Sequence, residues 1–166
     1  GDYNLNGYRY QNSERGIYVK GKWESVLLRD ILEDVRYTHK IKKSEYLPEG
    51  EYPIIDQSSN FIAGYCDNKD FLYNVTKPVV IFGDHTRELK YVDFDFVLGA
   101  DGVKILQFKE VASAKYLYYV LKNTPIKSLG YSRHFKELVR LEIPLPPIEE
   151  QKKIVEELDR YQRVID

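Results

Sequence analysis

The stretch VIFGDHTRELKYVDFDFVLGAD, residues 80–101, decides the fold of this sequence. It opens with a continuous apolar run that ends at Gly83, and a polar turn follows. Beyond the turn, apolar and acidic residues alternate, which is the period of a β-strand with one buried face. The apolar positions expected on that face are Val92, Phe94, Phe96 and Leu98. The stretch therefore predicts β-structure around an exposed turn.

Short runs of residues that favour strands surround this stretch on both sides. Between Tyr52 and Phe108 the runs are YPIID, FIAGY, FLYNV, PVVIF, YVDFDFVL and VKILQF. Glycine, aspartate and asparagine separate them, as at Asp101-Gly102, and these residues are typical of turns. The spacing predicts a curled, mainly antiparallel sheet.

Helical patterns flank the predicted sheet. In WESVLLRDILEDV, residues 23–35, apolar positions share one helical face and Ser25 is placed to cap it, so we expect a short helix. Ser113 is the expected N-cap of a second helix, AKYLYYVLKN, and a third covers 135–139 before the extended piece LEIPLP. The expected fold class is α/β, in the α+β sense.

A longer helix is predicted after Pro147, a residue suited to the first helical position, with two glutamates at the positive end of its dipole. Its apolar residues recur at alternating spacings of four and three, as in a coiled coil: Ile154, Leu158, Tyr161 and Ile165. This stripe can fold back on its own domain or meet another helix, and we expect the second: a partner helix from a second copy or a missing half. The expected organisation is an extended leader over 1–22, a domain over 23–146 and this helix over 147–166.

Composition restricts the function. The net charge of -1 gives no long-range attraction to nucleic acid, so a nucleic-acid protein of this composition must gather its positive charge locally. The single cysteine, Cys66, excludes an intrachain disulfide and a cysteine zinc site. No metal site is expected, because the three histidines lie far apart in sequence. Without a membrane span or signal peptide, we expect a cytoplasmic protein.

The turn at residues 84–87 carries the most informative polar side chains. It displays a carboxylate, an imidazole, a hydroxyl and a guanidinium, which together suit base edges or phosphates. The alternative is a plain hairpin in which Asp84 and Arg87 pair with each other. A metal-dependent nuclease site built from Asp84, Glu88 and Lys90 is disfavoured, because its carboxylates would have to converge from separate elements.

Two further segments collect positive charge. They are RYTHKIKK, residues 36–43, and KSLGYSRHFKELVR, residues 127–140. Basic residues beside aromatic ones suit a sugar-phosphate backbone, although solvated loops have the same composition. The phosphate-binding, hydrolase and zinc-protease motifs are absent, and IPLPPIEE lacks the Asn or Asp and the aromatic that flank the proline pair of an adenine methyltransferase.

Together these blocks resemble the specificity subunits of type I restriction-modification systems. The resemblance runs through WESVLLRDI, YPIIDQSSNFIAGY, PVVIFGDHTRELKYVDFDFVLGADGVKIL and HFKELVRLEIPLPPIEEQKKIVEELD, nearly the whole chain. It implies a domain with no catalytic site that recognises double-stranded DNA. It also implies a helix that packs against a second recognition half. The implied partners are an adenine methyltransferase subunit, which would hold S-adenosylmethionine, and an endonuclease/translocase subunit.

Two features depart from that family: one recognition domain is present, and the helix has about half the expected length. The chain is then half a subunit, a truncation, or the tail of a fused restriction-methyltransferase enzyme. A scaffold that binds protein and not DNA is the other alternative. The expected nucleic-acid-binding residues are Lys40, Lys43, Ser58, Asn60, His85, Thr86, Arg87, Tyr131, Ser132, Arg133 and His134.

Overall fold

The computed structural model describes residues 11–13, 16–18, 23–130 and 133–165. The strands are β1 (Gln11–Ser13), β2 (Gly16–Tyr18), β3 (Ser25–Leu27), β4 (Lys40–Ile41), β5 (Tyr52–Ile55), β6 (Gly64–Cys66), β7 (Leu72–Tyr73), β8 (Val79–Gly83), β9 (Leu89–Val92), β10 (Phe96–Gly99), β11 (Val103–Leu106) and β12 (Glu142–Pro144). The helices are α1 (Ala114–Lys122), α2 (Phe135–Leu138) and α3 (Ile148–Ile165), with 3-10 turns η1 (Leu28–Ile31), η2 (Lys43–Glu45) and η3 (Lys69–Phe71).

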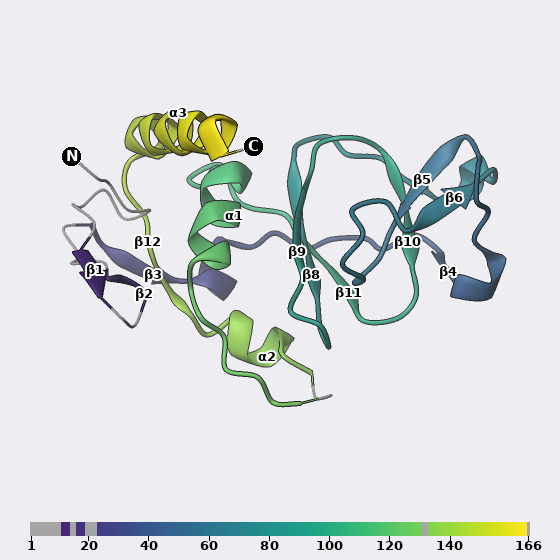
Figure 1. The fold of residues 1–166 in the computed structure, drawn as a ribbon, viewed down its shortest axis with the longest axis horizontal. Helices are drawn as coiled ribbons and strands as arrows, with labels where there is room; N and C mark the ends of the chain where they lie inside the picture. The colour runs from purple at the N-terminus through teal and green to yellow at the C-terminus, as the bar shows by residue number, and fades with distance from the viewer. Residues whose placement is uncertain (1–10, 14–15, 19–22, 131–132, 166) are drawn as a thin grey trace.

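A three-stranded antiparallel sheet of order β11-β8-β9 forms the middle of the molecule (Figure 1). Both faces of β8 are covered, which is why its sequence is apolar at every position. Val80 and Phe82 join a core beneath the helices, whereas Val79 and Ile81 join a second core on the opposite face. This strand therefore holds the two halves of the molecule together.

The half away from the helices is a second sheet of order β4-β10-β5-β6, with β7 also paired to β10. Among the described strands, pairings are antiparallel except those of β10 with β4 and β5. The predicted class, a curled and mainly antiparallel sheet with short helices, is confirmed.

The run YVDFDFVL is divided between these two sheets, so the expectation of one strand is wrong. β9 ends at Val92 and β10 begins at Phe96, and the Asp95 carboxylate between them accepts a hydrogen bond from the Val75 amide at 2.7 Å. Val92, Phe96 and Leu98 still share one core, with Phe94 packed against it. The alternation was informative about burial but not about strand continuity.

The helical half contains α1 and α2, the start of α3, and the paired strands β3 and β12 around one core. The predicted cap of α1 is confirmed: the Ser113 hydroxyl accepts a hydrogen bond from the Tyr116 amide. The short helix over 135–138 and the extended piece before Pro146 are also confirmed. α3 begins one residue later than predicted, and the Pro147 carbonyl accepts its first backbone bonds, from Glu150 and Gln151.

The helix expected over 23–35 is wrong. Ser25 lies in β3 and caps nothing, and a 3-10 turn follows at Leu28–Ile31. The reason is pairing with a distant segment: β3 lies against β12, and the Leu28 amide donates to the Leu141 carbonyl at 2.9 Å. These tertiary bonds replace the helical ones, while Leu28 and Ile31 are buried all the same.

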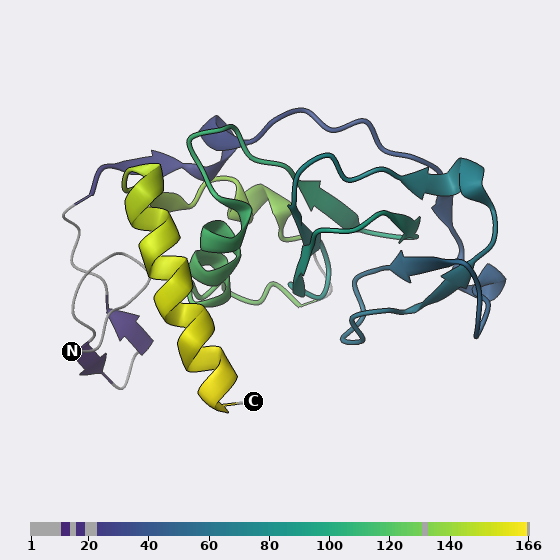
Figure 2. The same cartoon turned by 90° about the horizontal axis from the view of Figure 1, so that it is seen from above.

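Residues 32–39 form an extended strap that runs from the helical half to β4 at the other end of the molecule (Figure 2). The strap covers the free edge of β11. The Glu33 amide donates to the Gln107 carbonyl at 2.8 Å, and the Ile105 amide donates to the Tyr37 hydroxyl at 3.0 Å. Edge groups that would otherwise be open to another strand are thereby paired.

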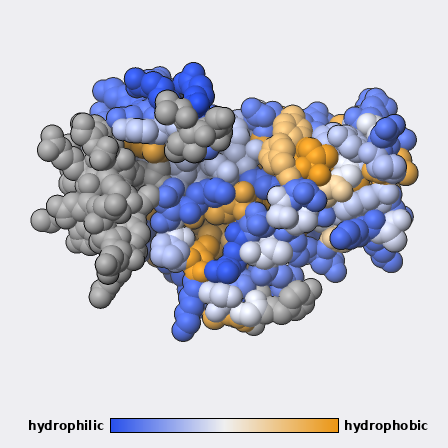
Figure 3. All heavy atoms as spheres, viewed as in Figure 1, coloured by the Kyte–Doolittle hydropathy of each residue, from blue (hydrophilic) through white to orange (hydrophobic). Residues whose placement is uncertain are grey.

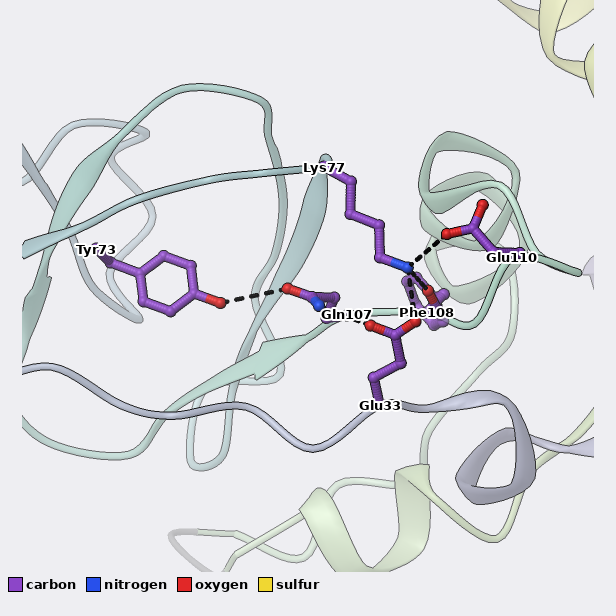
Figure 4. Close-up of polar contacts among 6 residues, drawn as sticks. All are labelled: Glu33, Tyr73, Lys77, Gln107, Phe108 and Glu110. Carbon is purple, nitrogen blue, oxygen red and sulfur yellow. Dashed lines mark hydrogen bonds and ion pairs between the residues drawn. The ribbon is translucent and has the colours of Figure 1, made fainter.

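A polar cluster fastens the strap to the chain on either side of it (Figure 4). Lys77 Nζ donates to Glu33 at 2.6 Å and to Glu110 at 3.2 Å, and Gln107 Nε2 donates to the other Glu33 oxygen at 2.7 Å. The hydrogen bonds from Gln107 and then Lys77 hold the pKa of Glu33 below its usual range, although partial burial opposes them.

The apolar stripe of α3 packs mostly on its own domain. Ile154 is only 7% exposed and Leu158 is half-buried against the same core, so the expectation that both face a partner helix is wrong. Asp159 adds hydrogen bonds from Lys115, at 2.9 Å, and from the Tyr119 hydroxyl. Figure 3 shows hydrophilic residues over the outer side of α3. Within the described residues, no helix has the length and apolar character needed to cross a bilayer.

The end of the stripe is different. Tyr161 is 46% exposed, and the side chain of Ile165 lies outside what the structure describes. The segment expected to be an extended leader contains the antiparallel pair β1 and β2, and residues 1–10, 14–15 and 19–22 lie outside the described part.

Candidate nucleic-acid interface

Four connections that are distant in sequence meet at one side of the central sheet. They are the turn after β5 (residues 56–60), the β8–β9 turn (84–88), the β10–β11 turn (100–102) and the described residues that precede α2 (129–130 and 133–134). The tip of the β8–β9 hairpin and α2 lie on the same side of the molecule in Figure 1. We refer to them as the four turns.

Gln57 joins three of the four turns. Its Oε1 accepts hydrogen bonds from the amides of His85, at 3.0 Å, and Thr86, at 3.3 Å. Its Nε2 donates to the Asp101 carbonyl at 2.7 Å, and its own carbonyl accepts from the Thr86 hydroxyl at 2.7 Å. Sequence analysis named its neighbours Ser58 and Asn60 and missed Gln57, although it stands in the same QSSN turn.

The β8–β9 turn is tight. A Cβ on Gly83 would lie 2.3 Å from Thr86 Oγ1 and 2.7 Å from the Cβ of Gln57, so only glycine fits there. Arg87 has a φ of 65°, in the left-handed region that a bulky residue rarely occupies. The turn therefore presents Thr86 and Arg87, both exposed, on a backbone held from several sides.

Asp84 and Arg87 have separate partners, so the hypothesis of a hairpin closed by their pairing is not supported. Arg87 donates to the Ile126 carbonyl at 2.6 Å. The buried Asp84 carboxylate accepts from the Phe135 amide at 2.7 Å, at the start of α2. A carboxylate there satisfies an amide that has no partner within the helix.

His134 is a structural residue, which corrects its assignment to DNA contact. It is fully buried; its Nδ1 lies 2.9 Å from the Asp84 carbonyl, and its Nε2 accepts from the Leu129 amide at 3.0 Å. Because a carbonyl only accepts and an amide only donates, the proton of the ring belongs on Nδ1. His134 thus fixes the loop before α2 onto the β8–β9 turn.

Hydrogen bonds made by the side chains of Asp56 and Lys90 fix the turn after β5. Asp56 accepts from Ser58 through both hydroxyl, at 2.6 Å, and amide, and from the Tyr46 hydroxyl at 3.0 Å. Burial acts to raise the pKa of Asp56, but these hydrogen bonds and the charge of Lys90 outweigh it and keep the pKa low. Lys90 Nζ donates to the carbonyls of Asp56 and Asn60, at 2.8 and 2.6 Å.

These contacts also speak against a nuclease site. The Asp84 carboxylate faces α2 and the Lys90 ammonium faces the turn after β5, so the two do not converge with Glu88 on one point. In the part of the chain that the structure describes, no three His, Cys, Asp or Glu side chains group as metal ligands would.

Positive charge lies beside the turns at Lys40 and Lys104. Burial lowers the pKa of Lys40, and the neighbouring charge of Lys104 lowers it further, while Asp101 opposes both. Lys40 Nζ lies 4.8 Å from the centre of the Tyr37 ring, and Lys104 Nζ lies 5.3 Å from that of Phe135. Sequence analysis missed Lys104, which follows the GADG turn directly.

The other residues predicted to bind nucleic acid differ in their exposure and in their place relative to the four turns. Ser58 is half-buried and its hydroxyl is bonded to Asp56, whereas Asn60 and Arg133 are exposed. Lys43 is exposed in η2 and takes no part in the contacts that join the four turns. Tyr131 and Ser132 lie outside the described residues.

A cleft adjoins the β8–β9 turn on the side of α1. Thr86, Arg87, Glu88, Lys122 and Thr124 line it. The exposed donors around this cleft and on the turns suit hydrogen-bond acceptors on base edges and phosphates.

Comparisons with known proteins agree on one family. The family model described as type I restriction modification DNA specificity domain matches residues 20–166. The chain is 28% identical to the specificity subunit of the type I restriction enzyme EcoR124I/EcoR124II from Escherichia coli, over 73% of this chain and 33% of that subunit. It is 27% identical to the MjaVIII specificity subunit from Methanocaldococcus jannaschii, over 95% of this chain and 40% of that subunit.

The fold is shared with solved structures. The S subunit of a type I restriction-modification system from M. genitalium superposes with a TM-score of 0.63 at 19% identity, over 86% of this chain and 39% of that one. The chain spans two fifths or less of the length of the curated relatives described above.

Proposed function

The chain belongs to the type I restriction modification DNA specificity domain family, and from this premise we propose that it recognises a target sequence in double-stranded DNA. In this proposal the chain is the part of a restriction-modification complex that reads the sequence. The chemistry of methylation and cleavage resides in other subunits.

The convergence of the four turns carries the proposal. Hydrogen bonds join segments from four places in the sequence into one surface. The exposed residues of this surface include Asn60, Thr86, Arg87 and Arg133. Hydroxyl, amide and guanidinium groups on a rigid support are what direct contact with base edges requires. Lys40 and Lys104 supply local positive charge beside this surface, as a chain with a net charge of -1 needs.

The proposed partners follow from the family and from the length of the relatives. A second recognition half would complete the site, and we propose that it contacts the C-terminal end of α3, at the exposed Tyr161 and at Ile165. An adenine methyltransferase subunit holding S-adenosylmethionine and an endonuclease/translocase subunit would act on the bound DNA. A fused restriction-methyltransferase enzyme that carries this chain as its tail would use the same surface.

A salt titration tests the proposal. We expect the logarithm of the affinity for duplex DNA to fall with the logarithm of salt concentration, with a slope of about -0.9 for each phosphate contacted. A duplex selected from a random library should bind more tightly than an unrelated duplex at every salt concentration. Absence of duplex binding, alone or with a methyltransferase partner, would favour the protein-binding scaffold instead.

A further inference from the structure

We propose that Gln57 is a positioning residue for DNA recognition: it sets the placement of the exposed side chains on the β8–β9 turn and thereby the sequence selectivity. This inference rests on the proposed function and extends it to a residue that touches no DNA itself. Its basis is the placement of one amide group between three turns.

A primary amide is the chemical group that this place requires. Two backbone amides, of His85 and Thr86, point at Oε1 and need an acceptor, while the Asp101 carbonyl lies 2.7 Å from Nε2 and needs a donor. A carboxylate would serve the first pair but would face the carbonyl without a proton to donate. An apolar side chain of similar length would serve neither.

The β8–β9 turn is expected to change its conformation when the Gln57 side chain is removed. Arg87 has a φ of 65° and directly follows His85 and Thr86, whose amides donate hydrogen bonds to Gln57 Oε1. Backbone in this region persists when its surroundings hold it in place. Without the Gln57 side chain, the β8–β9 turn keeps its contacts through Asp84 and from the Thr86 hydroxyl to the backbone carbonyl of residue 57, but loses those to its central amides.

Loss of this amide should affect recognition more than folding. Gln57 is half-buried and belongs to none of the three apolar clusters that form the cores. Gln107 provides a matched control, because it is also half-buried and its amide also both donates, to Glu33, and accepts, from Tyr73. The side-chain partners of Gln107, Glu33 and Tyr73, lie in the strap and in β7, outside the four turns (Figure 4).

The experiment uses the full chain with the substitutions Gln57→Met, Gln57→Glu and Gln107→Met. A duplex is first selected from a random library with the wild-type chain. Each variant is then measured against this duplex and an unrelated one, well below its melting temperature. The readout is the dissociation constant for the unrelated duplex divided by that for the selected duplex, so a smaller ratio means lower selectivity. The melting temperature of each variant is recorded alongside.

We expect Gln57→Met to reduce this ratio about tenfold, as loss of a good base contact would, and to retain binding to the unrelated duplex. Gln57→Glu should give an intermediate ratio, because the acceptor remains. Gln107→Met should keep the wild-type ratio even where its melting temperature falls. An unchanged ratio in Gln57→Met, or an equal loss in Gln107→Met, would overturn the inference. A wild-type chain that selects no duplex would overturn the proposed function, and the inference with it.

Discussion

At the scale of the residue, Arg87 is the exposed group best placed to read a base. Its guanidinium is anchored on the Ile126 carbonyl, which uses one of its five donors, and Arg87 lines the cleft beside the turn. Replacing Arg87 by Ala should weaken binding to the selected duplex by about 1–3 kcal/mol, if it contacts a guanine. Fluorescence anisotropy with selected and unrelated duplexes measures both affinities.

Arg87→Gly is the matched control for this prediction. Glycine occupies positive φ without strain, so it removes the same side chain while favouring the observed turn. Both variants should lose the selective part of the affinity. If Gly retains it while Ala does not, the backbone and not the guanidinium is responsible. An equal loss on every duplex would identify a phosphate contact instead.

Sequence analysis located turns and apolar core positions well, and it failed on the burial of polar side chains. The GDHTR turn was found because glycine and small polar residues mark turns locally, whereas Ser58 and Asn60 were named from the family resemblance. His134 was misassigned because its basic neighbours in KSLGYSRHFK suggest a solvated surface. Only the fold shows that its ring lies beneath the loop, between Asp84 and Leu129. Gln57 was missed for the same reason, since its three partners belong to other segments.

At the scale of the element, the strap depends on the ion pair between Lys77 and Glu33. The folded protein holds the Glu33 pKa below its ordinary value of about 4.3. The hydrogen bonds from Gln107 and Lys77 that lower the pKa therefore stabilise the fold fully above that value, and their contribution is lost as pH falls through the lower folded pKa. We expect Lys77→Met to lower the melting temperature at neutral pH, and the difference from wild type to shrink in acid as pH falls through the lowered pKa of Glu33.

Lys152→Met serves as the control for the strap. Lys152 makes an exposed ion pair with Glu149 along α3, and such pairs contribute little. Its melting temperature should follow wild type across the whole range. A difference between Lys77→Met and wild type that persists unchanged in acid would show that Lys77 acts through its hydrogen bond to the Phe108 carbonyl, at 2.6 Å, and not through Glu33.

Elements were predicted correctly where local signals agree. α1 has a serine cap, an apolar stripe and no competing partner, so its sequence suffices. Residues 23–35 have an equally good apolar stripe. Their first part nevertheless forms β3, because it pairs through its backbone with β12, more than a hundred residues away. The division of YVDFDFVL at Asp95 likewise depends on an amide of the β7–β8 connection, which no local pattern reveals.

At the scale of the whole molecule, the two halves of the α3 stripe should behave differently. Leu158 packs on the core, so Leu158→Asp should cost about 2 kcal/mol of stability and leave a monomer that unfolds more readily. Tyr161 is exposed, so Tyr161→Asp should preserve the melting temperature and abolish any self-association. Sedimentation at several concentrations, with thermal melts, distinguishes the two. Self-association that survives Tyr161→Asp would place the contact elsewhere.

The pairing of β3 with β12 gives the domain a narrow stem. Ser25 lies opposite Pro144, and the Leu145 amide donates to the Glu24 carbonyl, so the chain enters and leaves side by side. Everything between, including both apolar cores beyond the stem and all four turns, is a single excursion from these two strands. Segments with adjacent ends are readily inserted into a host chain. The region between the two strands thus has the ends of an exchangeable segment, but a replacement would have to keep the contacts that hold α3, such as Lys115 with Asp159 and the Ser113 amide with Gln151.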